Sequence, residues 1–197
     1  MARGVCYCCK TALTTDRGAV VAAWRHVYPG SQRDIAVARS TDGGTRFSTP
    51  TRVSQDGWAI DGCPENGPAV ATDGAGRVHV VWPTLVRDAG SERLTVFHAV
   101  SRADGTFSPR QPLPGGSAAF HPQTALVRND RLAVVWEVPT PDGRRLQLAW
   151  GRIRPDGTAR FSATALATGA GALYPTVSRV TVDRVLLTWT VRTGGGS

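Results

Sequence analysis

Alternating hydrophobic and polar residues occur in short runs along the chain, and four of these runs end in a tryptophan. The four tryptophans, spaced 53 to 58 residues apart, are Trp24, Trp82, Trp136 and Trp189. A second alternating run precedes each of the last three and begins at Pro68, Pro122 or Pro175. Alternation with a period of two is typical of a β-strand with one buried face. Self-similarity at a period of about 50 residues, built from short strands and Gly/Asp turns, predicts a β-propeller.

Each repeat is predicted to form a blade of four strands, a to d. In the first repeat these strands are expected at residues 10–15, 19–25, 34–40 and 51–54. The blades are expected at about 6–57, 64–115, 118–168 and 172–193, the last with strands a and b alone. Residues 194–197, Gly-Gly-Gly-Ser, resemble a linker or a tag. The predicted fold class is all-β, with no helix, because no run with a period of 3.6 follows an N-cap.

Three and a half blades do not close a ring. In a propeller each blade is covered by its neighbours, and the last blade seals against the first. The open edges predict a piece of a longer protein, or a truncated gene product. The missing blades, or self-association, are then expected to cover the two strands of the fourth blade.

Composition and charge narrow the class of protein. The 197 residues include 22 Gly and 13 Pro and are 41% hydrophobic, which suits a turn-rich globular domain. No apolar run approaches the roughly 18 residues that cross a bilayer, and the first residues lack a secretion signal. The net charge is +8, and of the 23 basic residues only Lys10 is a lysine. The arginines are scattered along the sequence and not clustered on one helix or stripe, so no nucleic-acid partner is expected.

A turn motif follows strand c in three repeats. In the first repeat it reads Ser-Thr-Asp-Gly-Gly-Thr-Arg-Phe, with its key residues at Ser40, Asp42, Gly44 and Phe47. Degenerate copies contain Asp104 and Phe107, and then Asp156 and Phe161. The motif resembles the Asp-box (BNR repeat) of the sialidase superfamily, Ser-x-Asp-x-Gly-x-Thr-Trp. The resemblance implies a six-bladed, sialidase-type propeller, in which each Asp-box carboxylate binds the backbone of its own turn and the aromatic ring packs into the blade.

The same resemblance bears on catalysis. Sialidases use three arginines, a Tyr–Glu nucleophile pair and an Asp acid, and the first arginine lies in a Phe/Tyr-Arg-Ile-Pro motif. This chain offers only Arg152-Ile153-Arg154-Pro155, at the end of a strand c. A non-catalytic propeller is therefore expected, with Glu137, Tyr174, Arg25 and Arg192 as weak catalytic candidates. The alternative is a fragment of an exo-α-sialidase or related glycoside hydrolase whose arginine motif lies in missing blades.

Four cysteines precede two of the inner strands. Cys6, Cys8 and Cys9 form Cys-x-Cys-Cys before the first, and Cys63 lies before the second. Inner strands of adjacent blades begin about 10 Å apart or less, so Cys63 is expected close to at least one of the other three. Three interpretations stay open: a disulfide between blades, a thiolate site for Zn or Cu, or free thiols. The pattern is similar to that of bacterial sialidase-like propellers with a Cys-x-Cys-Cys cluster and a Cys-Pro one blade later.

Topology places the d-to-a and b-to-c loops together at one end of the blades, here named the mouth. It is formed by the loops before Lys10, Pro68, Pro122 and Pro175. The candidate ligand-binding residues there are Trp58, Glu65, His121, Tyr174 and His26. The predicted function is an extracytoplasmic bacterial module that binds a glycan, another small molecule or a metal at the mouth, with any signal peptide outside this chain.

Overall fold

The computed structural model describes residues 4–88 and 90–192, and this part of the chain is all-β. Its first two sheets contain β1 (Ala12–Asp16), β2 (Ala19–Tyr28), β3 (Gln32–Ser40), β4 (Thr51–Arg52), β5 (Ala69–Thr72), β6 (Val78–Asp88), β7 (Ser91–Val100) and β8 (Gln111–Ser117). The others contain β9 (Phe120–Arg128), β10 (Arg131–Thr140), β11 (Gly143–Ile153), β12 (Ala159–Ala165), β13 (Ala172–Arg179) and β14 (Val185–Val191). The short 3-10 helix η1 (Pro29–Ser31) connects β2 to β3. Within the described ranges there is no α-helix, and no helix long and apolar enough to cross a membrane.

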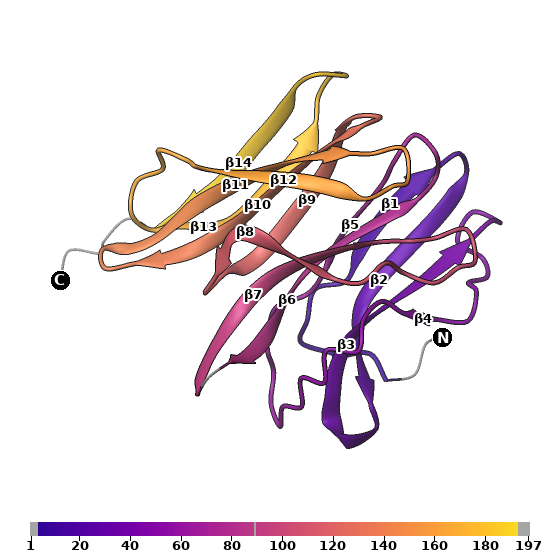
Figure 1. Ribbon diagram of the computed structural model, residues 1–197, viewed down its shortest axis with the longest axis horizontal. Helices are drawn as coiled ribbons and strands as arrows, with labels where there is room; N and C mark the ends of the chain where they lie inside the picture. Colours follow the sequence, from indigo (N-terminus) through magenta and orange to yellow (C-terminus); the bar gives the residue numbers. More distant parts are fainter. Residues whose placement is uncertain (1–3, 89, 193–197) are drawn as a thin grey trace.

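The strands form three four-stranded antiparallel sheets and one two-stranded sheet, each in sequence order. The sheets are β1–β4, β5–β8, β9–β12 and β13–β14. The first strands of consecutive sheets contact one another, β1 with β5, β5 with β9 and β9 with β13, so they line the inside of the arc (Figure 1). This arrangement confirms the predicted partial propeller. The predicted tail, 194–197, lies outside the described residues.

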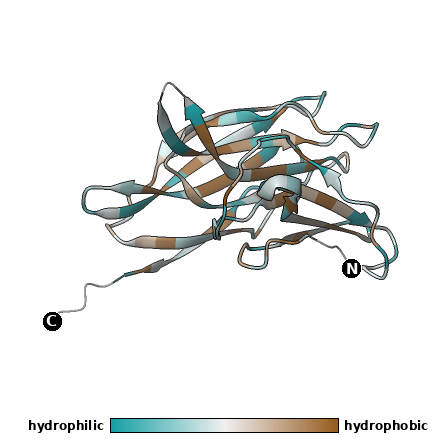
Figure 2. Ribbon diagram, turned by 90° about the horizontal axis from the view of Figure 1, so that it is seen from below, coloured by the Kyte–Doolittle hydropathy of each residue, from teal (hydrophilic) through white to brown (hydrophobic). Residues whose placement is uncertain are grey.

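The core lies between the blades, where hydrophobic side chains of adjacent sheets form shared clusters. Hydrophobic positions recur along the strands that form these clusters (Figure 2). Val21 and Ala23 of β2 pack against Val80 and Trp82 of β6 in one continuous cluster. Alternation along β2 turns Trp24 to the opposite face of the first blade, which no described blade covers. Burying one such aliphatic or aromatic side chain contributes about 1.5–3 kcal/mol, so the inter-blade faces dominate the stability of the arc.

The four tryptophans that define the repeat differ in exposure. Trp82 and Trp136 are fully buried, and Trp24 is almost so. Trp189 is 40% exposed, and its neighbours Leu186 and Val191 on the same strand are exposed as well. The fourth sheet has only two described strands, so one face of β14 lacks a covering layer, as expected for the final half blade.

The three turn motifs hold themselves together through their carboxylates. The Asp42 carboxylate accepts hydrogen bonds from the Ser40 hydroxyl (2.7 Å) and the Arg46 backbone N–H (2.9 Å). Asp104 and Asp156 bind the backbone and hydroxyl groups of their own threonines, each two residues further on. Phe107 and Phe161 pack against the cores. Phe47, predicted to pack likewise, is 45% exposed because it lies beside Trp24 on the uncovered face of the first blade.

Candidate functional site

The inner strands begin with an unusual backbone conformation at the mouth. Glu65, His121 and Tyr174 stand at equivalent places before β5, early in β9 and early in β13, and each has a positive φ near 50°. Positive φ is uncommon for residues other than glycine and is maintained only where surrounding contacts fix it. The pairing of β9 and of β13 with the next strand also shifts register here, as at a β-bulge. Bulges redirect side chains, and these two bulges lie at His121 and Tyr174.

The buried carboxylate of Glu137 fixes two of these strained residues. It accepts hydrogen bonds from His121 Nδ1 (2.8 Å), Arg144 Nη1 (2.6 Å) and the backbone N–H of Tyr174 (2.6 Å). Burial raises the pKa of Glu137, but the hydrogen bonds from His121 and Arg144 outweigh burial and hold the pKa below its ordinary value. The carboxylate is therefore ionised and has no exposed surface. It connects the third blade to the fourth and has no free oxygen facing a ligand.

Arg25 has the corresponding role between the first two blades. Its guanidinium donates to the backbone carbonyls of Asn66 (2.8 Å) and Pro83 (2.6 Å) and lies 4.9 Å from the centre of the Trp58 ring. Arg25 and Glu137, two of the catalytic candidates, are both buried inside strands. The reason is that β2 continues to Tyr28 and β10 to Thr140, so the pairing extends beyond the tryptophans.

Asn66 continues this chain of contacts, since its side-chain oxygen accepts the His121 backbone N–H at 3.0 Å. Sequence reasoning did not single out Asn66 or Arg144. The signal available for Asn66 was its place beside Gly67 in the loop before β5. At Gly67 a Cβ atom would lie 2.0 Å from the Lys10 carbonyl oxygen, so this loop touches the start of the first blade.

The accessible part of the mouth is an aromatic surface flanked by charge. The Tyr174 ring is stacked at a tilt on the His121 ring, with centroids 4.9 Å apart, and the residue is 51% exposed. Lys10 Nζ lies 5.4 Å from the centre of the same tyrosine ring, although 164 residues separate the two in sequence. Glu65 is exposed in the neighbouring loop. The fold thus brings together Lys10, His121 and Tyr174 from three blades.

Three other candidates lie apart from this surface. His26 shares the uncovered face of the first blade with Trp24, whose indole N–H donates to His26 Nδ1 at 3.2 Å. Trp58 is 6% exposed, and the Arg25 guanidinium occupies its ring face. Arg192 is exposed near the end of the described chain, where its backbone N–H donates to Gly171.

The cysteines meet as expected. Cys8 and Cys63 form a disulfide, with Cα atoms 6.0 Å apart, which joins the first blade to the loop before the second. Cys6 and Cys9 are free thiols. The sulfurs of Cys6, Cys8 and Cys9 all lie within 4.8 Å of one another, but the disulfide takes Cys8 and Cys63 out of any thiolate shell. Two thiolates are fewer ligands than the four of a structural zinc site, so these residues do not fit one in this state.

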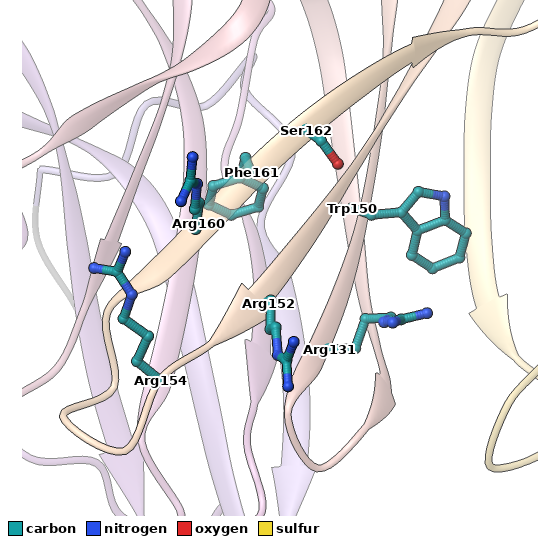
Figure 3. Close-up of a pocket in the computed structure, with 7 residues that line it drawn as sticks. All are labelled: Arg131, Trp150, Arg152, Arg154, Arg160, Phe161 and Ser162. Carbon is teal, nitrogen blue, oxygen red and sulfur yellow. The ribbon is translucent and has the colours of Figure 1, made fainter.

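Away from the mouth, a hollow of about 640 Å³ lies on the outer part of the third blade (Figure 3). It is lined by arginines of three neighbouring strands, and the register of these strands brings three of the arginines together. Arg131 is directly opposite Arg152, and Arg152 is directly opposite Arg160. Among the described residues, none of these three forms an ion pair. This ladder could not be predicted from the sequence, because it depends on pairing between strands.

Comparison with known proteins gives a fold. The chain resembles the endo-arabinase from Bacteroides thetaiotaomicron (TM-score 0.56, 11% identity), covering 90% of this chain and 68% of that enzyme. It also resembles the α-L-arabinanase of Penicillium chrysogenum (TM-score 0.53, 10% identity), covering 96% of this chain and 60% of that enzyme. A third neighbour is the α-L-arabinofuranosidase of Lactobacillus brevis (TM-score 0.50, 10% identity), covering 90% of this chain and 63% of that enzyme. No protein-family model matches the chain, and no curated protein does.

These neighbours are β-propeller glycoside hydrolases, and the chain spans between 60% and 68% of their lengths. At identities near 10% the likeness establishes the propeller fold alone. It does not single out the sialidase type that the turn motifs resemble.

Proposed function

We propose that this chain is a carbohydrate-binding segment of a β-propeller and that it binds its glycan at the mouth, without hydrolysing it. The observation that carries the proposal is the exposed Tyr174 ring, held in a strained backbone conformation by Glu137 and flanked by His121 and Lys10. Aromatic rings stack on the apolar faces of sugars, and nearby polar groups bind hydroxyls, so such a surface suits a saccharide.

Strain at three equivalent positions supports a binding role. A bulge with a positive φ destabilises the backbone by about 1–3 kcal/mol, and such strain clusters at functional sites. At the mouth, buried polar side chains of the preceding blade stabilise it at His121 and Tyr174. The result is a tyrosine ring and a histidine ring held in fixed orientation before any ligand arrives, which reduces the entropic cost of binding.

The absence of hydrolysis is argued from the carboxylates. Glycoside cleavage uses two carboxyl groups on opposite sides of the scissile bond, one as acid and one as base or nucleophile. In the described part of the mouth, Glu137 is buried with both oxygens engaged, so its carboxylate is not free to act as acid, base or nucleophile. The fold of the arabinan-processing neighbours favours a second candidate, part of a glycoside hydrolase whose further carboxylates come from additional blades.

The proposed location is extracytoplasmic. Disulfides persist in secreted and periplasmic proteins and are rare in the cytosol. The Cys8–Cys63 disulfide joins two blades in the described chain and supports this location.

Calorimetric titration of the chain with arabino-, xylo- and sialyl-oligosaccharides tests the proposal. We expect one class to bind with a Kd of about 1 mM or tighter, and Tyr174→Ala to weaken it about tenfold, which corresponds to about 1.4 kcal/mol. Phe47→Ala is the matched control, since Phe47 is a similarly exposed aromatic residue on a turn at the opposite end of a blade. Equal loss in both variants, or no binding by any class, would contradict the proposal.

A further inference from the structure

Three sulfur atoms form a compact cluster beside the mouth, all within 4.8 Å of one another. Cys9 Sγ is 3.0 Å from Cys6 Sγ, and Cys6 Sγ is 3.5 Å from Cys8 Sγ, which is bonded to Cys63. The central sulfur, on Cys6, therefore touches both a thiol and a disulfide. Thiol–disulfide exchange requires this arrangement, since a thiolate attacks one sulfur of an existing disulfide.

The backbone is already shaped for a second disulfide. The Cys9 backbone N–H donates to the Cys6 carbonyl at 3.2 Å, so residues 6–9 form a hydrogen-bonded turn. The ends of such a turn lie less than about 7 Å apart between Cα atoms, which is within the range a disulfide spans. A Cys6–Cys9 bond can therefore form without rearrangement of the chain.

The local chemistry makes Cys6 the attacking sulfur. Cys9 donates its S–H to Cys6 Sγ, which stabilises negative charge on Cys6. Burial, and then this hydrogen bond, raise the pKa of Cys9 to about 12, so Cys9 keeps its proton in the resting state. The buried Arg25 guanidinium acts in the opposite direction on the pKa of Cys9, and the Cys6 backbone N–H donates to the Arg25 carbonyl at 2.9 Å, so this strand lies directly beside the cysteines.

We propose that Cys6 and Cys9 form a redox-active dithiol that exchanges with the Cys8–Cys63 disulfide, so that the four cysteines form an internal disulfide relay. In the first step the Cys6 thiolate attacks Cys8 Sγ. The Cys6–Cys8 bond forms, the Cys8–Cys63 bond breaks, and Cys63 leaves as a thiolate that takes up a proton.

In the second step Cys9 gives up its proton and attacks Cys6 Sγ. The Cys6–Cys9 bond forms, and Cys8 leaves as a thiolate that accepts a proton. Two thiols and one disulfide are present before and after, so no external oxidant or reductant takes part. The exchange releases the covalent link between the first blade and the loop before the second, two residues from Glu65 at the mouth.

The distances favour exchange over metal binding. Two sulfurs that ligate one Zn each lie about 2.3 Å from it, which places them well over 3.0 Å apart in a tetrahedral shell. Cys6 and Cys9 are closer than that, and the neighbouring sulfur is already oxidised. A metal shared by Cys6 and Cys9 is therefore an outcome that would overturn the relay.

The sequence provides a direct assay. Trypsin places Cys6, Cys8 and Cys9 on one peptide, residues 4–10, and Cys63 on another, residues 53–77. The Cys8–Cys63 disulfide links the two peptides, whereas a Cys6–Cys9 disulfide leaves them separate. The protein would first be treated with limiting reductant until it contains two thiols and one disulfide per chain. It would then be held under argon at pH 5 or pH 8.5 and alkylated at low pH. Digestion without reductant and mass spectrometry would show whether the two peptides are linked.

We expect a fraction of the wild-type peptides to become unlinked at pH 8.5, with an internal disulfide in residues 4–10 and alkylated Cys63. Cys6→Ser, which lacks the attacking sulfur, should reduce the unlinked fraction about tenfold or more. Cys9→Ser permits the first step alone, so its unlinked peptide 4–10 should contain a Cys6–Cys8 disulfide, whereas the wild-type peptide should contain a Cys6–Cys9 disulfide and an alkylated Cys8. A wild-type link that persists at both pH values would overturn the relay. So would one equivalent of Zn²⁺ that protects both thiols from alkylation while the link stays intact.

Discussion

The Glu137 carboxylate of the third blade accepts the backbone N–H of Tyr174, at the start of the fourth, at 2.6 Å. The same relationship recurs between the first and second blades, where Arg25 donates to the carbonyl of Asn66. In both cases the residue directly after a repeat tryptophan extends into the next blade and holds the loop that forms the mouth. The rigidity of the mouth thus depends on buried polar contacts between blades, and not on the loops themselves.

Removal of the Glu137 carboxylate should destabilise the whole arc. Glu137→Ala removes the shared acceptor of three groups, Arg144 Nη1, His121 Nδ1 and the Tyr174 backbone N–H. We therefore expect the free energy of unfolding to decrease by about 3 kcal/mol. The measurement is the urea midpoint, followed by tryptophan fluorescence. Glu65→Ala serves as the control and should change stability by less than about 0.5 kcal/mol. Equal midpoints for Glu137→Ala and wild type would refute this role.

A buried histidine pair should make stability depend on pH near neutrality. His98 Nε2 lies 2.9 Å from His79 Nδ1, and His79 Nε2 lies 3.3 Å from Asp73. Burial, and then the charge of His79, hold the pKa of His98 well below its ordinary value. The unfolded chain binds a proton at His98 near pH 6.5, and the folded chain does not.

The free energy of unfolding should therefore decrease as the pH falls below about 6.5. In His98→Gln the decrease between pH 7 and pH 5 should become smaller, as urea midpoints measured across this range will show. The lowered pKa of Asp73 and of Glu137 acts in a separate window, since stability from these carboxylates is lost only below their ordinary range near pH 4. An unchanged slope in His98→Gln would show that His98 does not titrate in this way.

The disulfide should contribute strongly to stability. Cys8 and Cys63 are 55 residues apart, and closing a loop of that length lowers the entropy of the unfolded chain by an amount equivalent to about 4 kcal/mol. Cys63→Ser should therefore lower the urea midpoint substantially in non-reducing buffer. Wild type in reducing buffer should lose a similar amount, and a midpoint that does not respond to either change would contradict the prediction.

The repeat and the strands could be predicted because alternation and turn residues are local signals. The period of the tryptophans predicted the blades. The spacing of the inner strands alone predicted that Cys63 lies beside Cys6, Cys8 or Cys9. Arg25 and Glu137 were named as catalytic candidates, but their burial depends on how far β2 and β10 continue, which pairing with β3 and β11 decides.

Apart from the cysteines, contacts between distant residues could not be predicted from the sequence. The position of Lys10 over the Tyr174 ring depends on the curvature of the arc through four blades. The register of β10 to β12, which places Arg131, Arg152 and Arg160 side by side, depends on hydrogen bonds that no local pattern encodes. Phe47 was expected to pack like Phe107, but its exposure depends on which face of the first blade is covered.

The chain by itself should not cleave glycosides. Neither a fluorogenic sialoside nor an aryl α-L-arabinofuranoside should be hydrolysed above the buffer rate, because the Glu137 carboxylate has both oxygens engaged by His121, Arg144 and the Tyr174 N–H. The release of fluorophore or nitrophenol over hours is the measurement. Turnover that Glu65→Gln abolishes, at unchanged stability, would establish an enzyme instead.

The most direct test of carbohydrate binding at the mouth uses the three tyrosines of the chain, Tyr7, Tyr28 and Tyr174. With fluorotyrosine incorporated, each gives a ¹⁹F resonance, and Tyr174→Phe assigns the one at the mouth. During titration with the oligosaccharide class that binds by calorimetry, our account predicts that the Tyr174 resonance shifts to saturation with the same Kd. Saturable shifts at Tyr28 or Tyr7 with none at Tyr174 would contradict it.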